Sequence, residues 1–278
     1  MTTKKGDGGQ QAYTTNGTYT FTVPAGVTSI SMVCVGVGSL YEGTESSGRS
    51  GGNLAYTNAH TTTPGTNLTV TIGQNGLPAS HVGYFDEEET FIYVCFASNN
   101  RSSSTLVGTA SYYGGDRAGA NNGYPGGGGA AGYAGVGGQA GFGADTTNGY
   151  NGSNAAASSG GAGGGGGGGA EAGVEVIDEV EYPTYSPYTG GGGGGVGILG
   201  IGSTGTGGSG GGSNVGSGGG GGSGGTNGAV GGVTDGGNGG LYGGGGGGGQ
   251  NNAGTSGNGA VRIIWGAGRS YPSNAANV

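Results

Sequence analysis

The acidic residues of this chain are concentrated in two short clusters. Asp86–Glu89 places four carboxylates in a row, and residues 171–181 contain five more, so that the clusters hold nine of the 15 acidic residues. Clustered carboxylates are a ligand set that Ca²⁺ accepts, although the spaced acidic pattern of a helix–loop–helix calcium loop is absent. The weak candidate metal ligands are Asp86, Glu87, Glu88 and Glu89. Two other interpretations stay open: charge that keeps the protein soluble, and a loop that contacts a partner.

The second cluster lies in residues 171–189, whose tyrosines, prolines and carboxylates set it apart from its glycine-rich flanks. Tyrosine offers a large contact area at low conformational entropy cost, so we expect this excursion to be a contact arm, with a short hairpin around Val174, Val176 and Val180. The candidate partner-binding residues are Glu175, Asp178, Glu179, Glu181, Tyr182, Tyr185 and Tyr188, together with Tyr112 and Tyr113 beside a second loop. The alternative that tyrosines cap the glycine-rich part against water stays open.

Groups suited to catalysis are sparse. The two histidines, His60 and His81, show no spacing to a serine and carboxylate that suggests a triad, and no close Cys and His pattern suggests zinc. Several G-x-S-x-G and G-x-G-x-x-G matches occur, but none follows a predicted strand and opens a helix. We therefore expect a non-enzyme without a cofactor. For Cys34 and Cys95 we favour buried reduced thiols, with a disulfide as the alternative.

Composition narrows the classes of partner. Charged residues make up 8% of the chain, the net charge is −8 and the pI is near 4.5, which argues against nucleic acid because nucleic acid selects basic patches. No apolar run reaches the roughly 18 residues of a membrane span. The opening MTTKKGDGGQQ lacks the apolar core of a secretory signal. These features lead us to expect a virion or extracellular location reached without a signal peptide.

Residues 12–110 are expected to form β structure. Apolar residues alternate with threonines, turn residues separate the runs, and no segment has helical periodicity. The expected strands are Thr18–Val23, Val27–Val37, Leu54–Thr61, Leu68–Ile72, Phe91–Ala97 and a weaker Thr105–Ala110. Phe91–Ala97 is apolar on both faces, which predicts a central position. Ala260–Trp265 is again strand-like and is expected to return to the N-terminal sheet.

Between these β segments lies a glycine-rich stretch that we call the glycine region, residues 114–258. Glycine supplies 84 of the 278 residues and occurs in runs such as Gly163–Gly169 and Gly243–Gly249. Collagen is excluded, since only 7 prolines are present and the glycine spacing is irregular. Bare backbone can be ordered only by backbone hydrogen bonds, which neighbouring polyglycine-II helices exchange laterally.

Four stretches resemble a glycine-rich module found in virion proteins of tailed phages, notably cyanophage-type ones. They are Gln11–Val33, Gly52–Gly76, Tyr124–Gly138 and Gly259–Ser273. The glycine region is also similar in kind to the polyglycine sandwich of T-even-type tail-fibre adhesins. That resemblance implies a rigid slab whose joining loops bind a host surface. The chain departs from the module at the acidic Phe85–Thr90 and at Glu171–Thr189.

The expected fold is all-β: an N-terminal antiparallel β-sandwich, completed by a C-terminal strand, with a long inserted polyglycine-II helix bundle. The expected boundaries are an exposed segment 1–11, a sandwich of 12–113 plus 259–266, a bundle of 114–258 with the excursion 171–189, and a polar tail 267–278. The expected function is host attachment by a phage virion surface protein, through a protein or glycan receptor. The alternative is a self-assembling fibre or sheath subunit, a homo-oligomer in which residues 171–189 clasp the next copy.

Overall fold

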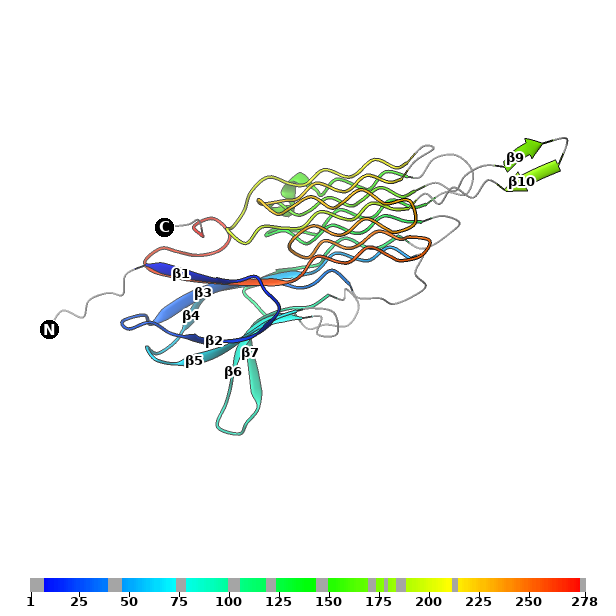
Figure 1. Cartoon of the computed structure of the whole chain (residues 1–278). Coiled ribbons are helices and arrows are strands. Elements are labelled where there is room, and N and C mark those ends of the chain that lie inside the picture. The colour runs from blue at the N-terminus through cyan, green and yellow to red at the C-terminus, as the bar shows by residue number, and fades with distance from the viewer. Residues whose placement is uncertain are drawn as a thin grey trace.

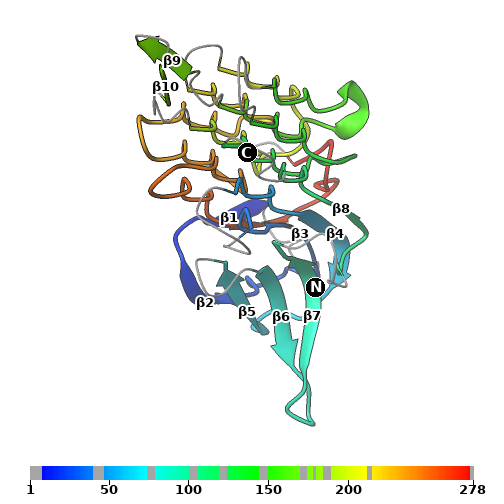
Figure 2. The ribbon, with the colours of Figure 1, turned by 90° about the vertical axis from the view of Figure 1, so that its right-hand side faces the viewer.

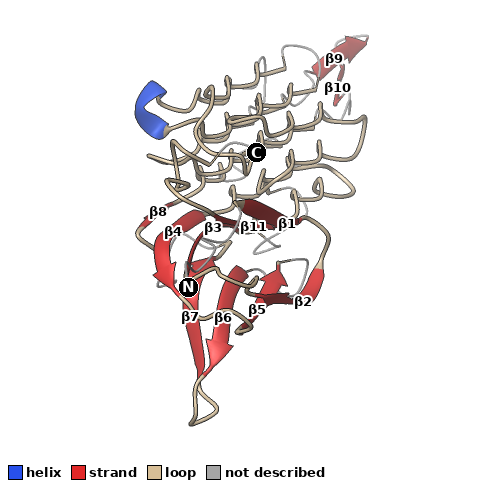
Figure 3. Cartoon of the chain, turned by 90° about the vertical axis from the view of Figure 1, so that its left-hand side faces the viewer, coloured by secondary structure: helices blue, strands red, loops and turns tan. Residues whose placement is uncertain are grey.

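The computed structural model consists of a β-sandwich and, stacked on one of its faces, a set of extended segments that run side by side (Figure 1). It describes residues 8–39, 47–73, 79–99, 106–118, 124–143, 150–169, 174–177, 180–183, 189–211 and 215–275. Within these ranges the one helix is the 3₁₀ turn η1 (Ala157–Ser159), blue in Figure 3. The described part of the chain is therefore all-β.

Two antiparallel sheets form the sandwich. The five-stranded sheet has the order β1 (Gly9–Tyr13), β11 (Ala260–Trp265), β3 (Ser29–Val35), β4 (Leu54–Thr61) and β8 (Ala110–Tyr112). The four-stranded sheet has the order β2 (Gly17–Thr22), β5 (Asn67–Ile72), β6 (Ser80–Phe85) and β7 (Phe91–Ala97). Strand β11 lies between β1 and β3, so the predicted return of Ala260–Trp265 to the N-terminal sheet is confirmed. The glycine region is thus inserted between two strands of one sheet.

The core between the sheets follows from alternation along the strands. In β2, Phe21 is buried while its neighbours Thr20 and Thr22 are exposed, as a half-buried strand requires. Cys34 and Cys95 are both buried and free, and the Cys34 thiol donates to the carbonyl oxygen of Cys95 at 3.6 Å. Burial, followed by the neighbouring Cys95 thiol, raises the pKa of Cys34. The favoured interpretation of reduced, buried thiols is therefore confirmed.

The central position predicted for Phe91–Ala97 is wrong, because β7 is the outermost strand of its sheet. On one face of β7 the aromatic side chains pack against one another and against β6, while Ile92 and Tyr93 are partly exposed. The rings of Phe91, Tyr93 and Phe96 all contact His81 of β6. Apolarity on both faces of this run thus reflects an aromatic cluster at a sheet edge.

Two strands lie outside the predicted set. Residues 9–11, expected in an exposed segment, begin β1, and Ser80–Phe85 forms β6. Strand β1 is held by residues distant in the sequence: the Arg262 guanidinium donates to the Gln10 side chain, and Arg269 donates to the Gly9 carbonyl oxygen. The polar tail is also anchored, because Tyr271 and Ala275 are buried.

In the glycine region the segments are stacked beside one another (Figure 2). Backbone hydrogen bonds with a period of three residues join neighbouring segments. Residues 163–168 donate in turn to Ala130, Gly220, Ser153, Gly127, Ser217 and Tyr150. Their carbonyl oxygens accept in turn from Gly138, Gly194, Gly208, Gly141, Gly191 and Gly211. All these N···O distances are 2.8–3.0 Å. The segment therefore has six different neighbours, three that accept its hydrogen bonds and three that donate to it.

This packing leaves no room for side chains. A Cβ atom on Gly165 would lie 1.8 Å from the Gln139 carbonyl oxygen, and one on Gly166 would lie 2.1 Å from that of Gly191. The segments nevertheless carry no assigned strand or helix beyond η1 and isolated bridges. The polyglycine-II helix bundle expected from the sequence is therefore not seen as regular elements within the described residues, because lateral rather than internal hydrogen bonds order these segments.

A second buried cluster joins the two parts. Leu54 and Ile264 from the five-stranded sheet pack with Tyr133 and Ile198 from the glycine region. Arg262 of β11 is 1% exposed, and its guanidinium donates to the carbonyl oxygen of Ile198 at 3.2 Å. We call this contact region the joint. It binds the glycine region to the sandwich through side chains.

Candidate binding surfaces

The segments of the glycine region reverse direction at both of its ends, with η1 at one end and β9 and β10 beyond the other (Figures 1 and 3). At the end nearer β9 and β10, backbone hydrogen bonds join Tyr150 to Phe142, Gly169 to Tyr124, and Gly190 to Gly248. The chain leaves this end after Gly169 and returns at Thr189. We call this the loop end. Loops held on a rigid scaffold often carry binding residues.

The predicted hairpin is present. Strands β9 (Val174–Ile177) and β10 (Val180–Pro183) pair antiparallel, with Glu175 opposite Tyr182 and Glu181 opposite Val176. The structure thus brings these members of the predicted contact set together on one hairpin. The remaining members on this arm lie outside the described residues: Asp178, Glu179, Tyr185 and Tyr188.

The loop end also exposes apolar side chains that the sequence analysis did not single out. Phe142 is 50% exposed and Tyr150 is 63% exposed, and the two are hydrogen-bonded neighbours. Val230 and Val233 are 58% and 77% exposed. Isolated apolar residues between glycines give no periodic signal, so nothing in the sequence pattern distinguishes them from buried positions.

Tyr112 and Tyr113 belong to the sandwich rather than to the loop end. Tyr112 lies in β8 opposite Leu54 and packs against the second buried cluster. The Tyr113 carbonyl oxygen accepts from the amide of Gly137. Both side chains are half-buried, and the structure does not bring them together with the β9–β10 hairpin.

The acidic run Asp86–Glu89 forms the turn between β6 and β7. One carboxylate oxygen of Asp86 accepts from the amides of Glu88 and Thr90 at 2.9 and 2.8 Å. This bonding holds the turn in shape and occupies that oxygen. In the described part of the chain, no group of three or more His, Cys, Asp or Glu side chains is arranged to hold a metal ion. The structure therefore does not assemble a calcium site from these four residues.

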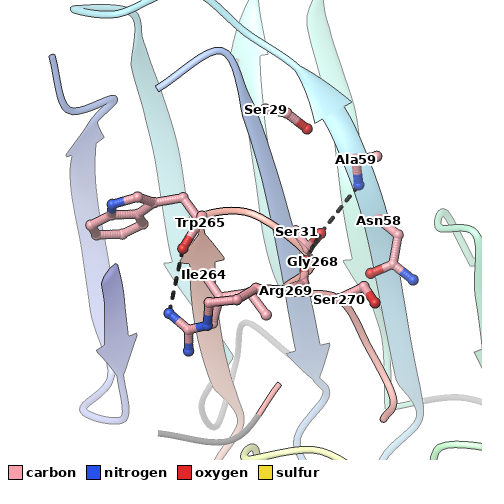
Figure 4. Close-up of a pocket in the computed structure, with 10 residues that line it drawn as sticks. Ser29, Ser31, Asn58, Ala59, Ile264, Trp265, Gly268, Arg269 and Ser270 are labelled. Atoms are coloured by element: carbon pink, nitrogen blue, oxygen red, sulfur yellow. Dashed lines mark hydrogen bonds between the residues drawn. The ribbon is translucent and has the colours of Figure 1, made fainter. Parts of the chain in front are cut away.

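A pocket of about 270 Å³ opens beside the end of β11, lined by residues including Ser31, Asn58, Trp265 and Arg269. Figure 4 shows its polar groups engaged with the protein: Arg269 donates to the Trp265 carbonyl oxygen, and Ser31 accepts from the Ala59 amide at 3.2 Å. The lining contains no carboxylate, imidazole or thiol. The pocket therefore offers a cavity and one cationic side chain, Arg269, but no acid–base pair.

The histidines are placed apart as well. His60 lies in β4 of one sheet and His81 in β6 of the other. Burial lowers the pKa of both imidazoles, so both favour the neutral form. Within the described residues no helix is long and apolar enough to cross a membrane.

Comparison with known proteins places the chain in a family. A family model described as a glycine-rich domain matches residues 14–213, which covers the sandwich apart from β1 and β11, and much of the glycine region. No curated protein matches the chain. The match includes strands β2 to β10 and, of the residues that form the joint, Leu54, Tyr133 and Ile198. This chain belongs to the glycine-rich domain family.

Proposed function

We propose that this chain is a non-enzymatic surface-attachment protein of the tail-fibre or adhesin type, in which the glycine region is a rigid support for the loop end. An origin in tailed phages, and hence a virion location, rests on the sequence resemblance. The host receptor is then a protein or a glycan that the loop end contacts.

As part of this proposal, the segments of the glycine region are polyglycine-II helices packed side by side. The support is the period of three in donors and acceptors along residues 163–168, because polyglycine-II has three residues per turn and no internal hydrogen bonds. Six neighbours around one segment is the number that hexagonal packing of such helices requires.

The observation that carries the attachment proposal is the projection of the β9–β10 hairpin beyond one end of this framework (Figure 1). Loops on a rigid scaffold lose little conformational entropy on association. The exposed Phe142 and Tyr150 and the β9–β10 hairpin lie at that end. Aromatic residues are the side chains that dominate contact energies in interfaces.

The test is adsorption of the fluorescently labelled full chain to a panel of bacterial strains. Two variants are compared with the parent: residues 174–183 replaced by a glycine–serine linker, and Phe142→Ser/Tyr150→Ser. The matched control is Leu199→Ser/Ile201→Ser, a pair with similar exposure near the tail residue Pro272. Strain-selective adsorption that either loop-end variant loses and the control keeps supports the proposal. Adsorption that neither variant changes, or no adsorption to any strain, would contradict it.

A second function is favoured by one observation. β9 and β10 form a two-stranded sheet of their own, and an isolated two-stranded hairpin is marginally stable in water. Pairing with another copy would cover its edges. Under this alternative the hairpin is a clasp between subunits of a fibre or sheath.

Sedimentation velocity separates the two functions. If the parent chain forms large assemblies and the linker variant of residues 174–183 is monomeric, the hairpin is a clasp. If the parent and the variant sediment alike as small species, the hairpin is free to contact a receptor.

A further inference from the structure

The end of the β6–β7 hairpin projects from the sandwich, away from the glycine region (Figures 1 and 2). We call residues 83–93 the finger. They comprise the end of β6, the acidic turn and the start of β7. Both faces of the finger are accessible: Phe85 and Tyr93 are 63% and 42% exposed on one face, and Ile92 is 36% exposed on the other.

The outer edge of β7 is covered over only part of its length. Phe96 exchanges backbone hydrogen bonds with Val107, and the Thr57 hydroxyl donates to the Val94 carbonyl oxygen at 2.7 Å. On that outer side, residues 91–93 have no backbone partner among the described residues. Edge strands are normally protected by lysine, proline or inward-pointing charge. The exposed part of this edge, Phe91-Ile92-Tyr93, has none of these.

The finger is rigid enough to serve as a template. Phe85, Phe91, Tyr93 and Phe96 form a continuous series of ring contacts with centroid separations of 4.9–5.0 Å. A Cβ atom on Gly83 would lie 2.5 Å from the Phe91 ring, so the glycine allows that ring to lie against the strand. Beyond the rings, Asp86 holds the turn closed by accepting from two backbone amides.

The negative charge of the turn indicates which kind of partner the β7 edge would bind. The turn presents four consecutive acidic residues, and Glu87, Glu88 and Glu89 are exposed. An unpaired strand edge recruits an extended peptide by backbone hydrogen bonds, and its neighbouring side chains set specificity. A carboxylate cluster at the end of that edge favours cationic partners and accelerates their association.

We propose that the finger is a docking site for an extended, basic segment of a partner protein, which adds as a further strand beside residues 91–93 of β7 with its cations against the Asp86–Glu89 turn. This surface is separate from the loop end and does not depend on the attachment function.

Aromatic rings are also a feature of sugar-binding surfaces, but the geometry of these rings disfavours that function. Successive rings are inclined at 78°, 67° and 71° to one another. They therefore present alternating edges and faces, whereas stacking along a glycan favours rings that lie flat in one surface. Sugar binding is accordingly an outcome of the test and not the proposal.

The experiment is fluorescence anisotropy of labelled probe peptides titrated with the full chain. One probe alternates lysine and valine, a second alternates glutamate and valine, and a third is the lysine–valine peptide N-methylated at every residue. N-methylation at every residue leaves the charge but removes the backbone donors on both edges of the peptide, which strand addition needs. The variants are Phe85→Ser/Tyr93→Ser and Glu87→Gln/Glu88→Gln, with Val230→Ser/Val233→Ser as the matched exposed apolar control.

We expect the lysine–valine peptide to bind at least about tenfold more tightly than either other probe. Phe85→Ser/Tyr93→Ser should weaken binding about fivefold or more, and Glu87→Gln/Glu88→Gln should reduce both affinity and salt dependence. The control should bind as the parent does, and all three variants should retain the parent melting temperature.

Three results would overturn the proposal. Equal binding of the methylated and unmethylated basic peptides would show charge attraction without strand addition. Unchanged affinity in both finger variants, or no binding of the basic probe, would show that the finger is not the site. Displacement of the peptide by neutral oligosaccharides would assign the aromatic face to sugars.

Discussion

In the sandwich, side chains such as Phe21, Ile30 and Leu68 fill the space between two sheets, whereas in the glycine region the neighbouring segments touch through bare backbone. The first arrangement draws its stability from apolar burial and close packing. The second draws it from hydrogen bonds that satisfy a buried backbone. The same chain thus builds two ordered layers from opposite compositions, one dense in side chains and one almost without them.

The comparison predicts that opposite kinds of substitution destabilise the two layers. A side-chain core is weakened by lost volume, which leaves a cavity. A backbone array is weakened by added volume, because a Cβ atom added to its glycines would lie closer to carbonyl oxygens than real Cβ atoms do. The joint depends on both, since Arg262 connects a strand of the sandwich to the backbone of the glycine region.

The largest effect is expected from one methyl group inside the glycine region. A Cβ atom on Gly194 would lie 2.0 Å from the Gly220 carbonyl oxygen, with backbone on both sides that cannot rotate away. Gly194→Ala should cost about 4 kcal/mol or more in the free energy of unfolding, measured by urea denaturation. Gly232→Ala is the control, because its nearest atom would be 3.1 Å away at an exposed turn. Equal stability of the two variants would contradict the claim that added side-chain volume destabilises the glycine region.

In the sandwich, loss of side-chain volume is expected to destabilise the fold. Phe21 is 1% exposed and its ring contacts Trp265. Phe21→Ala should cost about 3–4 kcal/mol because it opens a cavity between the sheets, whereas Phe21→Leu should cost clearly less. The same denaturation measurement applies. A loss as small as that of an exposed residue would indicate that the sheets close over the gap.

The joint is expected to couple the two layers. Removing Arg262 takes the guanidinium donor from the buried Ala275 carbonyl oxygen and leaves the Ile198 carbonyl oxygen with the Tyr271 hydroxyl alone. Arg262→Met keeps the apolar stem and should cost about 2–3 kcal/mol. Calorimetry should then separate the single unfolding transition of the parent into two. A single transition at the parent temperature would show that the layers are held together without this side chain.

The smallest expected effect is a loss of stability at acidic pH that arises from the two histidines of the sandwich. Burial lowers the pKa of His60 and His81, so the unfolded chain takes up protons more readily than the folded chain. The associated stability is present above the unfolded value of about 6.5 and is lost as pH falls through the folded pKa. His81→Gln should reduce the loss of melting temperature between pH 7 and pH 5. A variant that is as acid-sensitive as the parent would place the effect elsewhere.

The sequence predicts the parts of the fold that have a local pattern. Alternation of threonine with apolar residues predicts β2 and β5, and Leu54–Thr61 matches β4 residue for residue. The position of β7 is not predictable in this way, because an aromatic cluster and a buried strand share the same composition. Nor is the burial of Arg262, which depends on carbonyl oxygens distant in the sequence.

The candidate site shows the same division. The hairpin of β9 and β10 is predictable because valines alternate within a contrasting flank. Which residues lie at the loop end is not predictable, since it depends on which glycine segment lies beside which, and glycines carry no side-chain pattern to specify it. The finger was noticed in the sequence for its charge, while its exposed edge and rings appear only in the fold.

The most direct test of the central claim is amide hydrogen exchange of the full chain under native conditions. Lateral hydrogen bonds at 2.8–3.0 Å protect the amides of residues 163–168. We predict that these glycines exchange as slowly as the amides of β3 and β11 in the sandwich. Exchange at the rate of an unstructured chain would contradict the account, because the glycine region would then not be ordered by its backbone.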